Sequence, residues 1–184
     1  MQAELVDRAR RGDREAFSVL AAGAVDRLYA IARLSLRDTE LAEDATQDAL
    51  VRAWRDLPTL RDVERFDAWL YRLLVRSCAD IGRHRRRWRA EVTLLPEPAE
   101  ADSVTAVADR DLIERGLRRL TVPQQTILVL TYYVGLSPTE TADALDIPVG
   151  TAKSRLHYAI EALRAALAAD ERSGVGTTRE ERMA

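Results

Sequence analysis

The sequence predicts an all-α protein of two small helical domains joined by a flexible acidic linker. Apolar side chains recur at three- and four-residue spacing through most of the 184 residues, and no alternating strand pattern of convincing length appears. This periodicity breaks at residues 91–107, where prolines, small residues and acids replace it, as is typical of a linker. The shares of hydrophobic residues (47%) and charged residues (32%) indicate a globular protein with a heavily charged surface.

The first predicted domain, residues 1–90, contains four helices. The first helix is short and stops at Gly12, and Asp13 is placed to cap a longer second helix. A third helix follows Asp38 and carries alanines and leucines at helical spacing until a proline ends it. The fourth begins near Phe66, turns its leucines inward and continues into a block of arginines.

The second predicted domain, residues 108–170, ends in two closely spaced helices. Ser137 and Glu140, with a proline at the first helical position between them, form a capping box that starts a short helix. A second helix is expected to start at Pro148 or Val149 and to run to about Leu167. The tail, residues 171–184, has no apolar spacing and is predicted to be disordered.

These two helices have the layout of a helix-turn-helix, whose second helix reads the major groove of DNA. The amides and the macrodipole at the start of the second helix add affinity for phosphate. A plain helical hairpin with a solvated face is the alternative interpretation. The capping box, the tight turn and the cationic outer face together favour DNA binding. The side chains expected to face DNA are Thr151, Lys153, Ser154, Arg155, His157 and Tyr158.

The formal net charge of −2 hides a strong alternation of charge along the chain. Residues 38–48 contain five acids and no cation, whereas residues 66–89 contain seven arginines and two acids. Residues 90–114 then contain seven acids and one arginine. Blocks of charge separated in this way indicate distinct surfaces for distinct partners, with ordinary solvated faces as the alternative.

The sequence lacks the residue patterns that several classes of function require. One cysteine excludes an internal disulfide framework and a cysteine-clustered metal site, and only two histidines are present. We find no phosphate-binding loop, nucleophile–base pair or metal constellation, so no enzyme activity and no cofactor are expected. The sequence also lacks an apolar stretch typical of a signal peptide or a membrane span, which predicts a cytoplasmic protein without membrane insertion.

Three stretches of the chain carry a resemblance to one family. They are EDATQD with VRAW in residues 43–54, FDAWLYR with the following arginines in residues 66–89, and GTAKSRL in residues 150–156. In this order and spacing they make the chain resemble the bacterial extracytoplasmic-function (ECF, group IV) sigma factors, small two-domain initiation subunits of RNA polymerase. The resemblance covers about residues 5–167 apart from the linker, and Arg76 departs from it because asparagine is usual at that position.

The resemblance implies an alternative sigma factor that binds core RNA polymerase and directs it to promoters by their −10 and −35 elements. The first domain corresponds to sigma domain 2, which binds polymerase and recognises and melts the −10 element. The second corresponds to sigma domain 4, which recognises the −35 element. The implied partners are the β′ clamp helices and the β flap of core polymerase, promoter DNA and an anti-sigma factor. Polymerase performs the catalysis.

The resemblance also implies which residues make these contacts. An acid–amide–acid face on the third helix suits an arginine-rich helical partner, and the residues expected to bind polymerase are Asp44, Gln47, Asp48 and Arg52. Arginines at helical spacing on the fourth helix suit phosphates, and tryptophans beside them suit unpaired bases. The residues expected to contact the −10 element are Trp69, Arg72, Arg76, Asp80, Arg83, Arg85, Arg86, Arg87 and Trp88.

Ion pairs within the chain are expected to organise the arginine block. Asp80 lies between Arg76 and Arg83 and is expected to pair with both, at (i, i+4) and (i, i+3) spacing. In the inactive state the two domains are expected to close against each other or to be clamped by an anti-sigma factor. The acids of the linker are expected to pair with arginines of either domain and to mask them.

Two other functions remain as alternatives. A stand-alone helix-turn-helix regulator explains the second domain but gives no reason for the acidic face or for the arginine block. A sigma-mimicking interaction protein that titrates an anti-sigma factor does not need an intact basic DNA-binding face, and this chain has one. Co-purification with core polymerase, followed by run-off transcription, separates these alternatives from a sigma factor.

Overall fold

The computed structural model describes residues 1–91, 113 and 115–180. Every regular element within these residues is a helix, which confirms the all-α prediction. The predicted linker, residues 91–107, lies outside the described residues except for its first residue. Residues 181–184 of the predicted tail also lie outside them, as do the side chains of residues 85–91 and 170–180.

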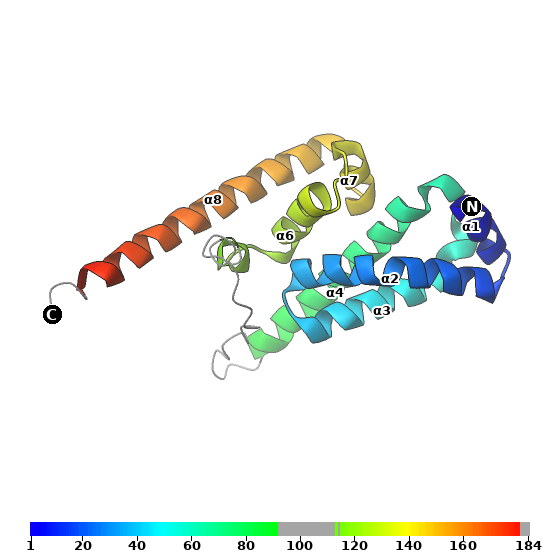
Figure 1. Ribbon diagram of the computed structural model, residues 1–184, viewed down its shortest axis with the longest axis horizontal. Coiled ribbons are helices and arrows are strands. Elements are labelled where there is room, and N and C mark those ends of the chain that lie inside the picture. Colours follow the sequence, from blue (N-terminus) through cyan, green and yellow to red (C-terminus); the bar gives the residue numbers. More distant parts are fainter. Residues whose placement is uncertain (92–112, 114, 181–184) are drawn as a thin grey trace.

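The first group contains four α-helices and two short 3₁₀ turns. The helices are α1 (Gln2–Arg10), α2 (Arg14–Leu36), α3 (Thr39–Asp56) and α4 (Phe66–Glu91). The 3₁₀ turns, Leu57–Thr59 and Val63–Arg65, connect α3 to α4. Helices α2, α3 and α4 lie side by side, and α1 packs against the start of α2 (Figure 1).

Aspartates start the second and third helices, as the sequence predicts. The carboxylate of Asp13 accepts hydrogen bonds from the amides of Glu15 and Ala16, both at 3.0 Å, and that of Asp38 accepts one from Leu41 at 3.0 Å. These contacts satisfy amide donors that have no partner inside the helix.

Small side chains allow α3 to lie close to its neighbours. Ala42, Ala45, Ala49 and Ala53 repeat along one face of α3 and are all fully buried. Larger residues, such as Leu28 of α2 and Leu74 of α4, fill the space opposite them in the same core cluster. The helix therefore buries one continuous stripe and leaves its opposite face available to a partner.

The second group contains α6 (Val122–Leu128), which continues into a π-helical turn (Val129–Tyr133), followed by α7 (Pro138–Leu145) and α8 (Val149–Glu180). The helical limits of α7 and the start of α8 agree with the predicted helix-turn-helix. The prediction of disorder after residue 170 is wrong for residues 171–180, because α8 continues through them. Extending an existing helix by one residue is far easier than nucleating a new one, so α8 continues without apolar periodicity.

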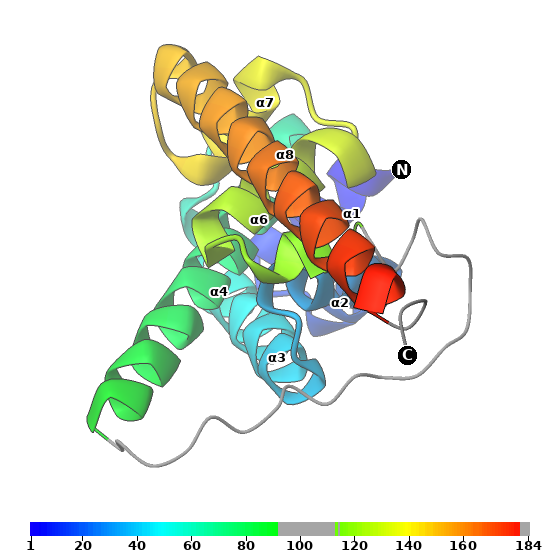
Figure 2. The ribbon, with the colours of Figure 1, turned by 90° about the vertical axis from the view of Figure 1, so that its left-hand side faces the viewer.

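The two groups pack against each other. A small core under α8 contains Leu120, Ile127 and Ala159, but Leu130 and Ala144 are buried in the same cluster as the first group. Helix α7 contacts α4, and α6 contacts both α2 and α4. Figures 1 and 2 show α6 and α7 lying over the first group, with α8 extending away from it. The described chain thus has a closed arrangement of its two helical parts.

Candidate functional site

The outer face of α8 near its start carries the residues predicted to contact the −35 element. Lys153, Arg155 and His157 are exposed, and Tyr158 has 68% of its surface accessible. Thr151, on the same face, is half-buried. The Ser154 hydroxyl donates a hydrogen bond to the backbone carbonyl of Gly150 at 3.0 Å. The face is therefore polar, cationic and accessible.

Helix α7 and its turn hold this face in place. Ser137 and Glu140 form the predicted capping box: the Glu140 carboxylate accepts from the Ser137 amide at 2.8 Å, and the Ser137 hydroxyl accepts from the Glu140 amide at 3.2 Å. Asp146 ends α7 in the left-handed region at φ 56°, which turns the chain sharply. Ala152 and Ala159 on the inner face of α8 are buried. The predicted helix-turn-helix is confirmed.

The predicted −10 residues lie along α4. Arg76 and Arg83 are exposed, whereas Arg72 is half-buried. Trp69 is also half-buried and packs against the core, with its ring 6.0 Å from that of Phe66, which agrees with a packing role. The backbone of the last predicted −10 residues belongs to α4, but their side chains lie outside the described residues: Arg85, Arg86, Arg87 and Trp88.

The expected pairing of Asp80 with both Arg76 and Arg83 is only half right. Asp80 pairs with Arg83 but not with Arg76, and its second partner is Arg52 of α3, at 3.1 Å. Arg76 instead extends to Asp146, at 2.7 Å. Sequence spacing alone does not decide between partners, because packing of α4 on α3 and α7 brings distant groups closer than the next helical turn.

Two further arginines, Arg65 and Arg72, also contact the end of α7. Arg65 pairs with the Asp143 carboxylate at 2.5 Å. The Arg72 Nε donates to the Asp143 carbonyl at 2.9 Å, and its guanidinium lies 3.7 Å from Asp146. The helix-turn-helix therefore covers part of the predicted −10 surface.

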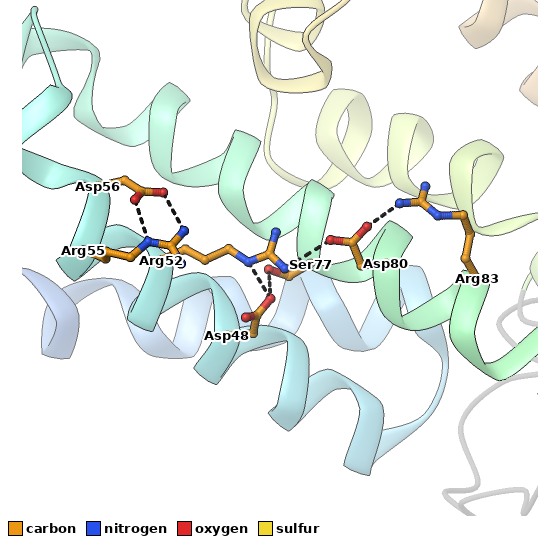
Figure 3. A network of polar contacts seen from close by, with 7 residues as sticks. All are labelled: Asp48, Arg52, Arg55, Asp56, Ser77, Asp80 and Arg83. Carbon is orange, nitrogen blue, oxygen red and sulfur yellow. Dashed lines mark hydrogen bonds and ion pairs between the residues drawn. The ribbon is translucent and has the colours of Figure 1, made fainter.

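Two of the four residues predicted to bind polymerase take part in a polar network between α3 and α4 (Figure 3). The Ser77 hydroxyl, which is fully buried, donates to the Asp48 carboxylate at 2.6 Å. Asp48 also pairs with Arg52 at 2.8 Å, and Arg52 extends to Asp80. Partial burial by itself would lower the pKa of Arg52, but the hydrogen bonds to Asp48 and Asp80 outweigh it and raise that pKa. Asp44 is exposed on the same helix, one turn away.

An apolar hollow between α2 and α3 lies beside this face and was not predicted from the sequence. Its lining includes Phe17, Gln47, Leu50 and Trp54. Trp54 has 37% of its surface accessible, and its ring lies 5.0 Å from that of Phe17. Leu50 and Trp54 lie four residues apart, each one residue after a buried alanine of α3. This second apolar row is the sequence signal that could have predicted the hollow.

Other kinds of site find no support in the described part of the chain. No group of three or more histidines, cysteines or carboxylates there is arranged to hold a metal ion. Cys78 is buried, and burial raises the pKa of its thiol to about 12, which is the behaviour of a small core residue. None of the described helices combines the length and the apolar character that crossing a membrane requires.

Comparison with known proteins identifies the two helical groups. Residues 22–90 match the family model of Sigma-70 region 2, and residues 110–163 match that of Sigma-70, region 4. The RNA polymerase sigma-E factor of Streptomyces coelicolor is 34% identical over 157 residues, which cover 85% of this chain and 89% of that protein. The ECF RNA polymerase sigma factor SigL of Mycobacterium tuberculosis is 37% identical over 136 residues, which cover 71% and 76% of the two chains.

Solved structures share this fold. CnrH, in complex with the cytosolic domain of CnrY, is 28% identical with a TM-score of 0.66 and covers 92% of this chain and 98% of its own. The sigma factor RpoE from Bartonella quintana, in complex with the anti-sigma factor NepR, shares the fold at 24% identity, with a TM-score of 0.67 over 84% and 98% of the chains.

A helical chain with region 2 followed by region 4 is a sigma factor of the sigma-70 type. This chain belongs to the extracytoplasmic-function RNA polymerase sigma factors. It is an alternative sigma factor that directs RNA polymerase to promoters, and the region 2 match separates it from a stand-alone helix-turn-helix regulator.

Proposed function

We propose that the chain divides promoter recognition between two domains, residues 1–90 and 108–170. The first binds core polymerase and recognises and melts the −10 element, and the second recognises the −35 element. The observation that carries this division is the pair of cationic surfaces on different helices, one along α4 and one at the start of α8. The chain supplies polymerase binding, promoter recognition and melting, and the polymerase performs the chemistry in the cytoplasm.

The β′ clamp helices of the polymerase bind α3 at its acidic face and at the apolar hollow. Asp44 and Gln47 are exposed on this face, and Gln47 also lines the hollow. An acidic rim beside an apolar floor suits a helix that carries both arginines and apolar side chains. The second domain in turn contacts the β flap.

On α4, arginines bind the phosphates of the opened −10 strand. Arg72, Arg76 and Arg83 are spaced along one helix, so their guanidinium groups meet successive phosphates. Asp80 acts through Arg83, with which it pairs, rather than by touching DNA. Trp69 supports this helix from the core side.

On α8, two cations have different tasks. Arg155 binds a guanine through its O6/N7 edge, because the planar guanidinium matches that edge and the side chain projects away from the buried alanines. Lys153, a point charge near the start of the helix, binds phosphate and so contributes affinity without sequence preference.

An anti-sigma factor regulates the chain. Support comes from CnrH and the Bartonella quintana sigma factor RpoE, whose structures were solved in complex with the cytosolic domain of CnrY and the anti-sigma factor NepR, respectively.

Co-purification with core polymerase, followed by run-off transcription, tests the proposal. Asp44→Arg is the preferred variant, because Asp44 is exposed, whereas changing Asp48 would also disturb Ser77 and Arg52. Charge reversal at an interface typically costs about 2–5 kcal/mol, so the variant should no longer co-purify. Glu4→Arg, an equal reversal at an exposed site on α1, should co-purify as the wild type does. Wild-type association of Asp44→Arg would remove α3 from the proposed interface.

A further inference from the structure

The end of α7 places acids on two arginines of α4 and on one in the 3₁₀ turn before it. The Asp146 carboxylate lies 2.7 Å from Arg76 and 3.7 Å from Arg72. Asp143 contributes its backbone carbonyl to Arg72 and its carboxylate to Arg65. Three arginines of the first helical group are thus occupied by one short segment of the second.

The chemistry of these contacts is the chemistry that DNA would use. A guanidinium group binds a carboxylate and a phosphate through the same planar arrangement of N–H donors. Asp146 is held at this place because it ends α7 in the left-handed conformation, and its own amide donates back to the Asp143 carbonyl at 3.2 Å. The two aspartates therefore occupy donors that phosphates would otherwise accept from.

Apolar packing supports the same closed arrangement. Leu130 and Ala144 of the second group are buried in the core cluster of the first. A Cβ atom added at Gly82 of α4 would lie 3.4 Å from a methyl group of Val122, at the start of α6. Opening the two parts would expose this apolar surface to water, so the closed form is stabilised by more than its ion pairs.

We propose that the end of α7, residues 143–146, is an intramolecular latch that keeps promoter DNA from Arg72 and Arg76 until the two domains separate. This inference rests on the proposed role of these arginines in binding the −10 strand. The latch acts on one surface only, because Lys153 and Arg155 of α8 remain exposed in the closed form. A partner that binds the separated form more tightly than the closed form releases the −10 surface.

A disulfide across the interface tests the latch directly. The added Cβ at Gly82 would lie 3.9 Å from the Cβ of Val122, within the usual range for a disulfide. In Gly82→Cys/Val122→Cys, oxidation should lock the free chain closed, and reduction should release it. The single variants Gly82→Cys and Val122→Cys are the controls, and they also report any cross-link to the buried native Cys78.

The readout is binding of a fluorescein-labelled, random-sequence single strand at low salt, in a Lys153→Ala/Arg155→Ala background that removes the contribution of α8. Cross-linking should weaken binding roughly tenfold or more, because at least two charge-assisted contacts are withheld, and reduction should restore it. Failure of the cysteines to cross-link in the free chain, or equal binding by the locked and reduced chains, would overturn the latch.

Neutralising the acids should have the opposite effect. Asp143→Asn/Asp146→Asn keeps side chains of the same size, and asparagine tolerates the left-handed conformation at position 146. We expect strand binding to tighten roughly threefold to thirtyfold, since partly exposed ion pairs are individually weak. Asp7→Asn/Asp56→Asn removes two paired acids within the first group and corrects for net charge. Equal gains in both double variants would contradict the latch.

The failure of the latch and the failure of the proposed function give different results. If Arg72→Ala/Arg76→Ala leaves strand binding by the reduced chain unchanged, the proposed −10 role is wrong, and the latch with it. If that variant weakens binding while the locked chain binds as well as the reduced chain, the −10 role stands and only the latch is wrong.

Discussion

The two surfaces proposed to face promoter DNA differ in how accessible they are within the same chain. On α8, Lys153 and Arg155 project from a helix whose other face is buried, and they are exposed in the described structure. On α4, Arg72 and Arg76 are equally cationic but contact Asp143 and Asp146 at the end of α7. The proposed −35 surface is thus accessible in the closed arrangement, whereas the end of α7 covers part of the proposed −10 surface.

This difference teaches that cationic character and availability are separate properties. Charge along a helix is readable from the sequence, but availability depends on what packs over the helix. The α3–α4 network adds a second example, because Asp48 and Arg52 are engaged with Ser77 and Asp80 inside the same domain. A predicted contact residue can therefore have a structural partner before its functional partner arrives.

The largest effect is expected from removing arginines of the proposed −10 surface. Arg72→Ala/Arg76→Ala removes two guanidinium groups from the proposed strand contact. Each charge-assisted contact contributes roughly 1.5–3 kcal/mol, so run-off transcription should fall by about two orders of magnitude or more. Arg164→Ala, which removes an exposed arginine paired with Glu161 on α8, is the control and should transcribe normally. Normal transcription by the double variant would remove these arginines from promoter opening.

A smaller, position-specific effect is expected on the −35 side. Arg155→Ala should cost roughly 1–3 kcal/mol and flatten the preference at one base pair. Lys153→Ala should weaken all sequences about equally and lower the salt dependence of binding by roughly one counterion. Holoenzyme binding to a library of single-base −35 variants at several salt concentrations measures both. Relaxed specificity in the lysine variant alone would reverse the two assignments.

The local elements of the fold could be predicted because their signals lie within a few residues of one another. Asp13, Asp38 and Ser137 start helices through bonds to amides two or three residues ahead, so spacing alone identifies them. The recognition helix could be predicted in the same way, because its buried alanines and its exposed cations each recur at helical spacing on opposite faces. The family resemblance then added the order of the two domains.

The tertiary contacts could not be predicted in this way. Arg76 has an aspartate four residues ahead, yet it pairs with one seventy residues away. The masking of the arginines was expected from linker acids, whereas the contacts described here come from Asp143 and Asp146. Which of several carboxylates reaches an arginine is decided by helix packing, and sequence spacing carries no information about that packing.

A moderate effect on stability is expected from disrupting the polar network between α3 and α4. This tests whether contact residues engaged inside the first domain also stabilise it. Ser77→Ala removes the buried hydroxyl that donates to Asp48, and this should lower the free energy of unfolding by about 1–2 kcal/mol. Ser18→Ala is the matched control, because its hydroxyl only bonds to the Arg14 carbonyl of its own exposed turn. Chemical denaturation measures both. Equal stability of the two variants would show that the network does not brace α3 against α4.

The smallest effect concerns the capping box that starts α7 and so positions both α8 and Asp146. Bonds from the Ser137 side chain and backbone lower the pKa of Glu140, so the box stabilises the fold above the unfolded pKa of about 4.3. That contribution is lost as the pH falls through the lower folded pKa. Glu140→Gln keeps an acceptor but does not titrate. The difference in melting temperature between wild type and Glu140→Gln should therefore favour wild type at pH 7 and shrink towards pH 3. A difference that stays constant over this range would mean that the charge of Glu140 adds nothing to the box.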